Sequence, residues 1–215
     1  MNYIEVESKV KAKSESVVLV AVSKTRPIED VYSAYKEGAR VFGENRVQEM
    51  EAKFSTDRPL DMKVYLIGQL QSNKVKKAVA LADRIESVDS IKLIDKIESE
   101  CSKIGKKIEV LLEVNSSGEE NKSGFKSEAE LFEAVERIKE CKHIDFKGLM
   151  TVGPLGFDKE KNQKAFEYTR SLYDKIKLVH PISVLSMGMS SDWEQAIDCG
   201  STEIRLGTVI FGERK

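Results

Sequence analysis

The chain has 215 residues, a formal net charge of −1, and a composition that is 40% hydrophobic and 33% charged. This length suits one domain of barrel or layered α/β size, and the balanced charge gives no general reason to expect nucleic acid or an anionic membrane as a partner. The three cysteines are far apart and the two histidines are isolated, which argues against a disulfide framework and against a metal centre. The N-terminus lacks the apolar segment of a signal peptide and no run reaches membrane-spanning length, so we expect a cytoplasmic protein.

Short apolar runs alternate with longer segments of helical period along the whole chain. Eight runs are expected to form strands: 17–22, 40–43, 63–68, 84–88, 108–114, 146–150, 184–188 and 203–212. Seven segments between them are expected to form helices, near 27–37, 46–54, 70–82, 90–103, 127–141, 158–178 and 191–198. Because no linker or composition break divides the chain, we expect a single domain over residues 1–215.

Several local signals mark where these helices begin and end. Pro27 fits the first turn of a helix, and Gly38 and Gly105 fit helix C-terminal stops. The patterns Ser-x-x-Glu at 127–130 and 191–194 are capping boxes, each expected to open a helix.

The strand-then-helix alternation predicts parallel strands joined by helical crossovers. Eight such units favour a (β/α)₈ TIM barrel over a doubly wound nucleotide-binding sheet. The first strand is followed by SKTRP, which lacks the glycine pattern G-x-G-x-x-G of dinucleotide-binding folds.

In such barrels the ligand site lies at the carboxyl ends of the strands. The stretches SMGMSSD at 186–192 and RLGT at 205–208 follow the last two expected strands and are rich in small and hydroxyl-bearing residues. Either stretch alone would be an ordinary turn. Together, on adjacent strands and beside the start of a helix, they predict an anion site of the kind that binds phosphate.

Lys24 follows the apolar run VVLVAV, where burial of an unpartnered ammonium would cost several kcal/mol. Inside a barrel mouth, beside another cation such as Arg205, its pKa is expected to fall, which makes the neutral amine available as a nucleophile. An amine that faces a phosphate-bearing carbonyl compound is the setting for a Schiff base. The residues alone leave two ligands open: pyridoxal 5′-phosphate, or a sugar phosphate in a Schiff-base aldolase.

Seven motifs in chain order carry a resemblance to a known family: AVSKT, FGENRVQE, LIGQLQSNK, NSSGEENKSGF, KGLMTV, LSMGMSSDWEQAIDCGST and RLGTVIFGER. They resemble the pyridoxal phosphate homeostasis proteins, single-domain relatives of the alanine racemase barrel with the type III fold of pyridoxal phosphate proteins. The resemblance runs from about residue 17 to residue 214. It departs at the N-terminus, where the segment 1–16 leaves the first helix shorter than in relatives.

The resemblance implies a pyridoxal phosphate site with Lys24 as the residue that forms the Schiff base and Arg205 as the residue that faces the pyridine nitrogen. Three further residues would hold the phosphate: Ser190, Gly207 and Thr208. Asn45 would line the cofactor, with Ser186 and Met187 at the same wall.

Glu44 and Arg46 flank Asn45 on the FGEN turn. They are as well explained as structural ion-pair residues, and the loop GQLQSNK at 68–74 is assigned no contact.

The resemblance also bears on activity. A cation at the pyridine nitrogen keeps that nitrogen unprotonated, so the ring is a weaker electron sink. Racemases with this arrangement pair the lysine with a tyrosine from a second domain of a neighbouring subunit, and we expect no second domain in a chain that ends at Lys215. We therefore expect a monomeric carrier that buffers pyridoxal phosphate or delivers it to apoenzymes. An amino-acid racemase and a Schiff-base lyase acting on a phosphorylated sugar remain alternatives.

Overall fold

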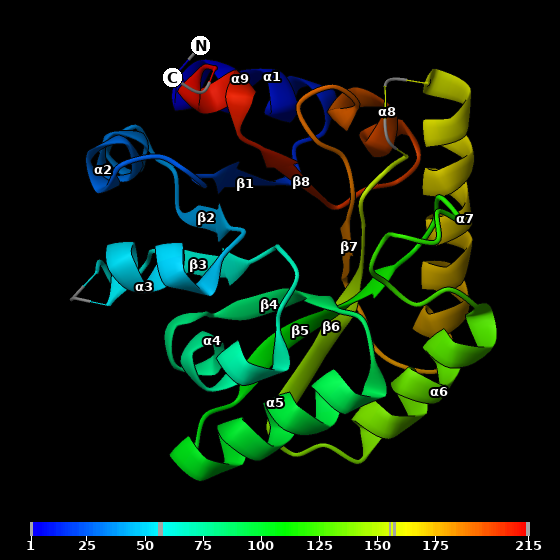
Figure 1. Ribbon diagram of the computed structural model, residues 1–215. Helices are drawn as coiled ribbons and strands as arrows, with labels where there is room; N and C mark the ends of the chain where they lie inside the picture. The colour runs from blue at the N-terminus through cyan, green and yellow to red at the C-terminus, as the bar shows by residue number, and fades with distance from the viewer. Residues whose placement is uncertain (1, 56–57, 155, 157, 214–215) are drawn as a thin grey trace.

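The computed structural model describes residues 2–55, 58–154, 156 and 158–213. In this part of the chain, eight parallel strands form a closed barrel in sequence order, with β8 hydrogen-bonded to β1 (Figure 1). The strands are β1 (Val18–Val22), β2 (Val41–Glu44), β3 (Lys63–Leu66), β4 (Arg84–Val88), β5 (Ile108–Val114), β6 (Ile144–Thr151), β7 (Val184–Ser186) and β8 (Glu203–Leu206). The predicted (β/α)₈ TIM barrel is confirmed.

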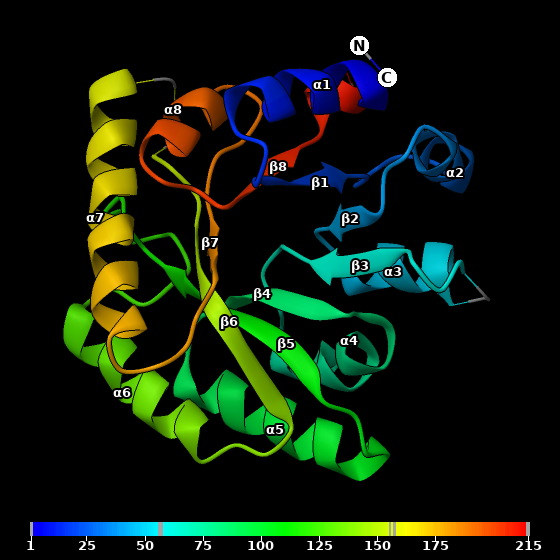
Figure 2. The same ribbon diagram turned by 180° about the vertical axis from the view of Figure 1, so that it is seen from behind.

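Helices cover the outside of the barrel, as both ribbon views show (Figures 1 and 2). They are α1 (Tyr3–Lys13), α2 (Ile28–Lys36), α3 (Val47–Phe54), α4 (Val75–Leu81), α5 (Ile91–Ile104), α6 (Glu128–Lys139), α7 (Lys159–Lys177), α8 (Trp193–Asp198) and α9 (Thr208–Phe211), with a short 3₁₀ turn η1 (Ser72–Lys74) before α4. The first and last helices lie side by side near the two chain ends. Among the described residues, no helix is long and apolar enough to cross a membrane.

Some predicted helix boundaries are confirmed by their capping contacts. Ser127 caps α6 by accepting a hydrogen bond from the Glu130 N–H, and Gly105 ends α5 in the left-handed conformation at φ 64°. The second capping box is wrong: α8 begins at Trp193, and the Asp192 carboxylate accepts from the Met189 N–H instead of capping the helix. Pro27 precedes α2 as its N-cap instead of lying in its first turn.

The last predicted strand, 203–212, is also too long. Its pairing with β1 ends at Ala21 opposite Leu206, and Thr208–Phe211 turns into α9. Once closure of the barrel is complete, the apolar residues that follow are buried by folding back, as Ile210 does. The predicted strand end was therefore wrong, because the residues after Leu206 are of types that are common in strands but lie in a helical turn.

Two sets of buried residues fill the molecule. The larger set packs strands against helices, and it excludes Val20, Val22, Tyr65, Leu111 and Met150, which are also buried. Because side chains alternate between the two faces of a strand, these five belong to the interior of the barrel. That interior also contains buried charged side chains from β4 and β8, which is unusual for a layer that Val, Ile and Leu normally fill.

Candidate functional site

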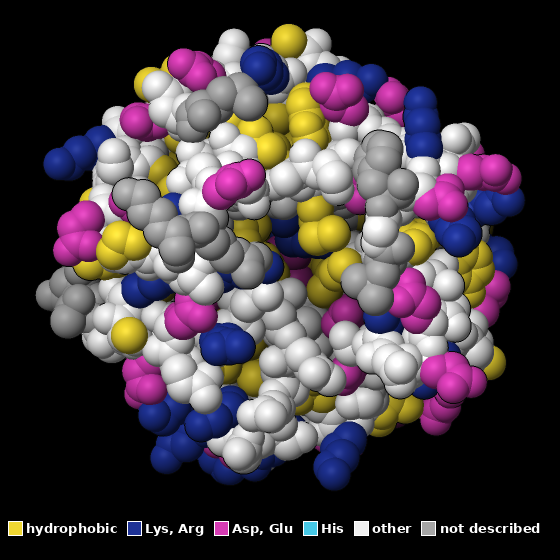
Figure 3. All heavy atoms as spheres, turned by 45° about the horizontal axis from the view of Figure 1, so that its top comes forward, with side chains coloured by type: hydrophobic (Ala, Val, Ile, Leu, Met, Phe, Trp, Pro, Cys, Tyr) yellow, Lys and Arg dark blue, Asp and Glu magenta, His cyan; other side chains and the backbone are white. Residues whose placement is uncertain are grey.

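A cavity of about 370 Å³ opens at the carboxyl ends of the strands. The space-filling view shows a hollow on this face, with Lys or Arg and Asp or Glu side chains visible in its depth (Figure 3). Its described lining includes three cations, Lys24, Arg26 and Arg205, and no Asp, Glu, His, Cys or Tyr. In a protein of net charge −1, such a lining favours an anionic ligand.

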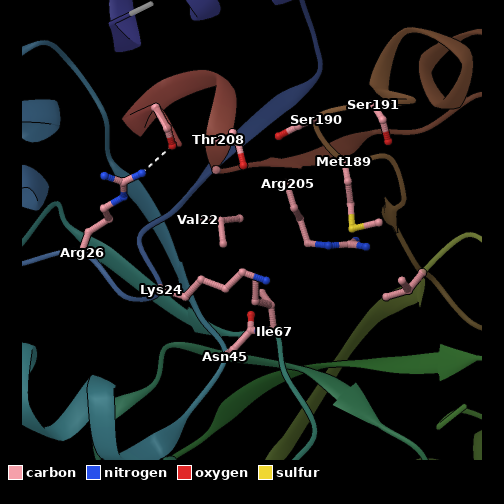
Figure 4. Close-up of a pocket in the computed structure, with 13 residues that line it drawn as sticks. Val22, Lys24, Arg26, Asn45, Ile67, Met189, Ser190, Ser191, Arg205 and Thr208 are labelled. Atoms are coloured by element: carbon pink, nitrogen blue, oxygen red, sulfur yellow. Dashed lines mark hydrogen bonds between the residues drawn. The ribbon is translucent and has the colours of Figure 1, made fainter. Parts of the chain in front are cut away.

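Lys24 reaches this cavity from the carboxyl end of β1. β1 ends at Val22, and Lys24 lies two residues further on, in the turn after the strand; the side chains of both residues line the cavity. Figure 4 shows the Lys24 side chain extending into the cavity toward the side where Arg205 lies.

The backbone before Lys24 is held by a buried ion pair. Lys53 Nζ lies 2.8 Å from Glu44 Oε1 and donates to the Ser23 carbonyl oxygen at 2.8 Å, while Ser23 Oγ donates to the same Glu44 oxygen at 2.7 Å. Burial raises the pKa of Glu44, against the opposing effect of the Lys53 and Ser23 hydrogen bonds. The ion-pair role considered for Glu44 is therefore present, whereas Arg46 is exposed at the N-cap of α3.

The residue after Lys24 adopts a backbone conformation that is rare for its type. Thr25 has φ 62°, and for a β-branched residue this left-handed conformation is strained. Its N–H donates to Glu49 Oε2 at 2.7 Å, which helps to fix the turn. Contacts on both sides of Lys24 thus set the direction in which its side chain leaves the turn.

Arg205 lies at the bottom of the cavity and is buried. Its Nη1 donates to Ser186 Oγ at 2.6 Å and its Nη2 donates to the Thr151 carbonyl oxygen at 2.7 Å. Both acceptors are neutral, so these two hydrogen bonds hold the guanidinium in place without neutralising its positive charge. It can therefore act as a cation toward a ligand.

Hydroxyl groups and a close backbone contact form the rim beside Arg205. Ser190, Ser191 and Thr208 line this side (Figure 4). A Cβ at Gly207 would lie 3.2 Å from the Val22 carbonyl oxygen, so a glycine lets the end of β8 approach β1 closely. Serine and threonine hydroxyls with exposed backbone N–H groups suit phosphate oxygens.

The structure brings six of the eight predicted site residues to the cavity: Lys24, Asn45, Ser190, Arg205, Gly207 and Thr208. The other two do not line it. Ser186 lies beneath Arg205, fully buried, and Met187 belongs to the core between strands and helices. Consecutive residues at the end of β7 point to opposite faces, so these two could not share one wall.

Seven lining residues were not among the eight predicted site residues. Met189 and Ser191 lie in the stretch 186–192 that was predicted to bind an anion, whereas five were missed: Val22, Arg26, Ile67, Val152 and Gly212. Val22 could have been found as the last residue of the expected strand 17–22, because the ligand site was expected at the carboxyl ends of the strands. No local sequence pattern would have identified Arg26. Its guanidinium is held by hydrogen bonds to the carbonyl oxygens of Gly212 and Glu213, which are far away in sequence.

The fold and the site together define a class of protein: a (β/α)₈ barrel with a lysine-containing, anion-attracting cavity at the carboxyl ends of its strands. A family profile described as "Alanine racemase, N-terminal domain" matches residues 2–215. The chain belongs to this family.

Similar proteins carry a consistent name. A Helicobacter pylori (strain ATCC 700392 / 26695) relative named pyridoxal phosphate homeostasis protein is 42% identical over 199 residues, covering 92% of this chain and 88% of the relative. A human relative of the same name is 41% identical over 210 residues, covering 91% of this chain and 76% of the relative.

Solved structures agree with the fold. PipY of Synechococcus elongatus PCC7942 without PLP has a TM-score of 0.91 at 37% identity and covers 98% of this chain and 100% of its own. PipY with PLP bound has a TM-score of 0.89 at 36% identity, with the same coverage. An alanine racemase of Clostridium difficile, at 17% identity and a TM-score of 0.82, shares the fold, and the match covers 99% of this chain and 57% of the racemase.

Proposed function

We propose that this protein binds pyridoxal 5′-phosphate reversibly in the cavity, with Lys24 as the residue that forms the Schiff base, and that it acts in intracellular pyridoxal phosphate homeostasis. The observation that carries the proposal is the placement of Lys24 and Arg205 in one cavity with a hydroxyl-bearing rim and, among its described lining residues, no carboxylate. Pyridoxal 5′-phosphate supplies an aldehyde that condenses with an amine, on a pyridine ring that carries a phosphate.

The residues present fit this group. Lys24 offers the amine, Arg205 offers a fixed N–H donor and positive charge, and the rim offers Ser190, Thr208 and the backbone at Gly207 for the phosphate. Asn45 lines the same cavity. The cavity volume lies in the usual range for small-molecule sites. The homeostasis name of the relatives and the PLP-bound PipY structure support the assignment.

The lining also favours a carrier over a racemase. Inverting an α-carbon needs one group to remove a proton from one face and another to deliver a proton to the opposite face. Among the described lining residues, Lys24 is the single side chain suited to proton transfer. The six tyrosines, Tyr3, Tyr32, Tyr35, Tyr65, Tyr168 and Tyr173, all lie outside this lining. The protein would then hold a reactive aldehyde and release it to pyridoxal phosphate-dependent apoenzymes, acting in the cytoplasm as a single-domain monomer.

Titration with pyridoxal 5′-phosphate tests the binding step. A visible absorbance band should appear with the wild type and be absent in Lys24→Ala and Lys24→Arg, the second of which keeps the charge but cannot form an imine. Lys76→Ala, at an exposed lysine of α4, is the matched control and should retain the band. A band of equal strength in Lys24→Ala would refute the site.

A second measurement separates carrier from racemase. The loaded protein is incubated with L- and D-alanine in deuterium oxide, and separately with an apoenzyme that requires pyridoxal phosphate. We expect activation of the apoenzyme and no repeated incorporation of deuterium at the α-carbon. Many turnovers of deuterium incorporation would overturn the carrier assignment in favour of the racemase.

A further inference from the structure

Arg205 and three further charged side chains form a buried layer inside the barrel, beneath the cavity. Arg84 and Glu86 come from β4, Glu203 and Arg205 come from β8, and none is more than 7% exposed. Residues two apart on a strand share a face, so each strand contributes a neighbouring pair to the interior. Buried charges require partners, which makes their hydrogen bonds informative.

A continuous chain of hydrogen bonds links Arg205 to Glu86. Arg205 Nη1 donates to Ser186 Oγ at 2.6 Å, and Ser186 Oγ donates in turn to Glu86 Oε2 at 3.0 Å. On the other side of the layer, Arg84 Nη1 donates to Glu203 Oε2 at 2.8 Å. Both glutamates thus use one carboxyl oxygen.

The two remaining oxygens, Glu86 Oε1 and Glu203 Oε1, are buried and have no hydrogen-bond partner among the described residues. Arg84 Nη1 lies 3.8 Å from Glu86 Oε1, beyond hydrogen-bond distance. Two ionised carboxylates side by side would repel each other, but one proton placed between them would satisfy both oxygens. Arg84 donates a hydrogen bond to Glu203 and none to Glu86, which favours placing the shared proton on Glu86.

We propose that Glu86 is a protonated positioning residue: it donates its proton to Glu203 and, through Ser186, holds Arg205 toward the cavity without neutralising the positive charge of Arg205. The consequence for the ligand rests on the proposed function, in which Arg205 faces pyridoxal phosphate. An ionised Glu86 at the same place would instead form a charge pair through Ser186 and reduce the field that Arg205 exerts on the ligand.

The surrounding charges agree with this assignment. Burial and the neighbouring Glu203 raise the pKa of Glu86 well above its usual range, against the opposing effect of Arg205 and Arg84. Among the described residues, the other titratable groups that interact with this layer include Tyr65 of β3, Glu109 and Glu113 of β5, and the buried Asp192 before α8, whose carboxylate interacts with Arg205. Glu109 pairs with Arg84 at 2.8 Å, and Glu113 accepts from Ser123 Oγ, so neither supplies a proton to Glu86.

Infrared spectroscopy of the protein without ligand tests the proton directly. The wild type at neutral pH should show a carboxylic-acid C=O band that Glu86→Gln removes, and Glu109→Gln should leave this band in place. Absence of a band that Glu86→Gln removes would overturn the proposal. Because no cofactor is present, this result does not depend on the proposed function.

Binding of pyridoxal 5′-phosphate tests the positioning role. The amide that Glu86→Gln introduces keeps an acceptor for Ser186 and a donor for Glu203, so affinity and the position of the visible band should stay close to wild type. Glu86→Leu breaks the chain and should weaken binding about tenfold, with a shifted band. Equal loss in both variants would overturn the neutral-Glu86 assignment. If the wild type itself fails to bind, the proposed function fails and the infrared result stands alone.

Discussion

Replacing Lys53 tests how the turn that carries Lys24 is held. Its side chain is 10% exposed, its partner Glu44 is 0% exposed, and the pair is 2.8 Å apart. Lys53→Met keeps most of the aliphatic stem and removes the cation, which leaves Glu44 buried with Ser23 as its remaining hydrogen-bond donor. Breaking a buried pair from one side costs about 3–5 kcal/mol. Because the Ser23 bond remains, we expect a loss near the lower end, about 3 kcal/mol.

Lys77→Met is the matched control. Lys77 and Glu51 are also 2.8 Å apart, but their side chains are 54% and 42% exposed. An exposed pair contributes about 0–1 kcal/mol, so this variant should change stability little. Urea unfolding of both variants at neutral pH, read from midpoint and slope, makes the comparison. Equal losses in the two variants would refute the argument from burial.

The pH dependence gives a second check on the same variant. Burial already raises the pKa of Glu44, and removing the Lys53 contact that opposes this effect should raise it further. A carboxyl whose pKa is higher in the folded state than in the unfolded state binds its proton more tightly when folded. Stability then falls as pH rises through the folded pKa. The deficit of Lys53→Met should therefore be largest at neutral pH and shrink toward mildly acidic pH. A deficit that is constant with pH would contradict an ionised Glu44.

Two further predictions concern the barrel and its helices. A Cβ at Gly148, at φ 152°, would lie 1.8 Å from the Val184 carbonyl oxygen, so Gly148→Ala should separate β6 from β7 and yield little folded protein. Gly105 has φ 64° and open space around it. Gly105→Ala should therefore lower the free energy of unfolding by only about 1 kcal/mol, measured by urea unfolding. Ser127→Ala removes the hydrogen bond from the Glu130 N–H and should lower the free energy of unfolding by about 1 kcal/mol, seen as a melting temperature a few degrees lower. Ser90 is the N-cap of α5 but its side chain accepts no capping hydrogen bond, so Ser90→Ala should lower the melting temperature less.

The order and type of the strands could be predicted because most of them are short apolar runs and all lie between segments of helical period. Strand ends were less predictable, because they depend on partners. β8 stops at Leu206, where its pairing with β1 ends, and the apolar residues 209–211 continue in a helical turn that buries Ile210. Nothing local distinguishes these residues from the continuation of a strand.

The candidate site was predictable in part for a similar reason. Lys24 stands out because a charge follows an apolar run. The sequence RIESV of β4 gave no such signal, since alternating charged and apolar residues are typical of a strand with one face in water. In the structure all five residues are buried, because the charged face of β4 points into the barrel. Alternation of charged and apolar residues shows that a strand has two different faces, but it does not show which face is exposed to solvent.

This charged layer is difficult to explain by stability. Replacing a buried ion pair by apolar side chains of similar volume is often neutral or stabilising, because desolvation of the charges offsets their attraction. A layer of Val, Ile and Leu, the usual filling of such barrels, would serve the core at least as well. An apolar layer could not accept the hydrogen bond of Ser186, through which the charged layer holds the Arg205 guanidinium while leaving its charge directed at the cavity. The layer therefore makes sense as support for anion binding above it, in a protein whose overall charge provides no attraction for an anion.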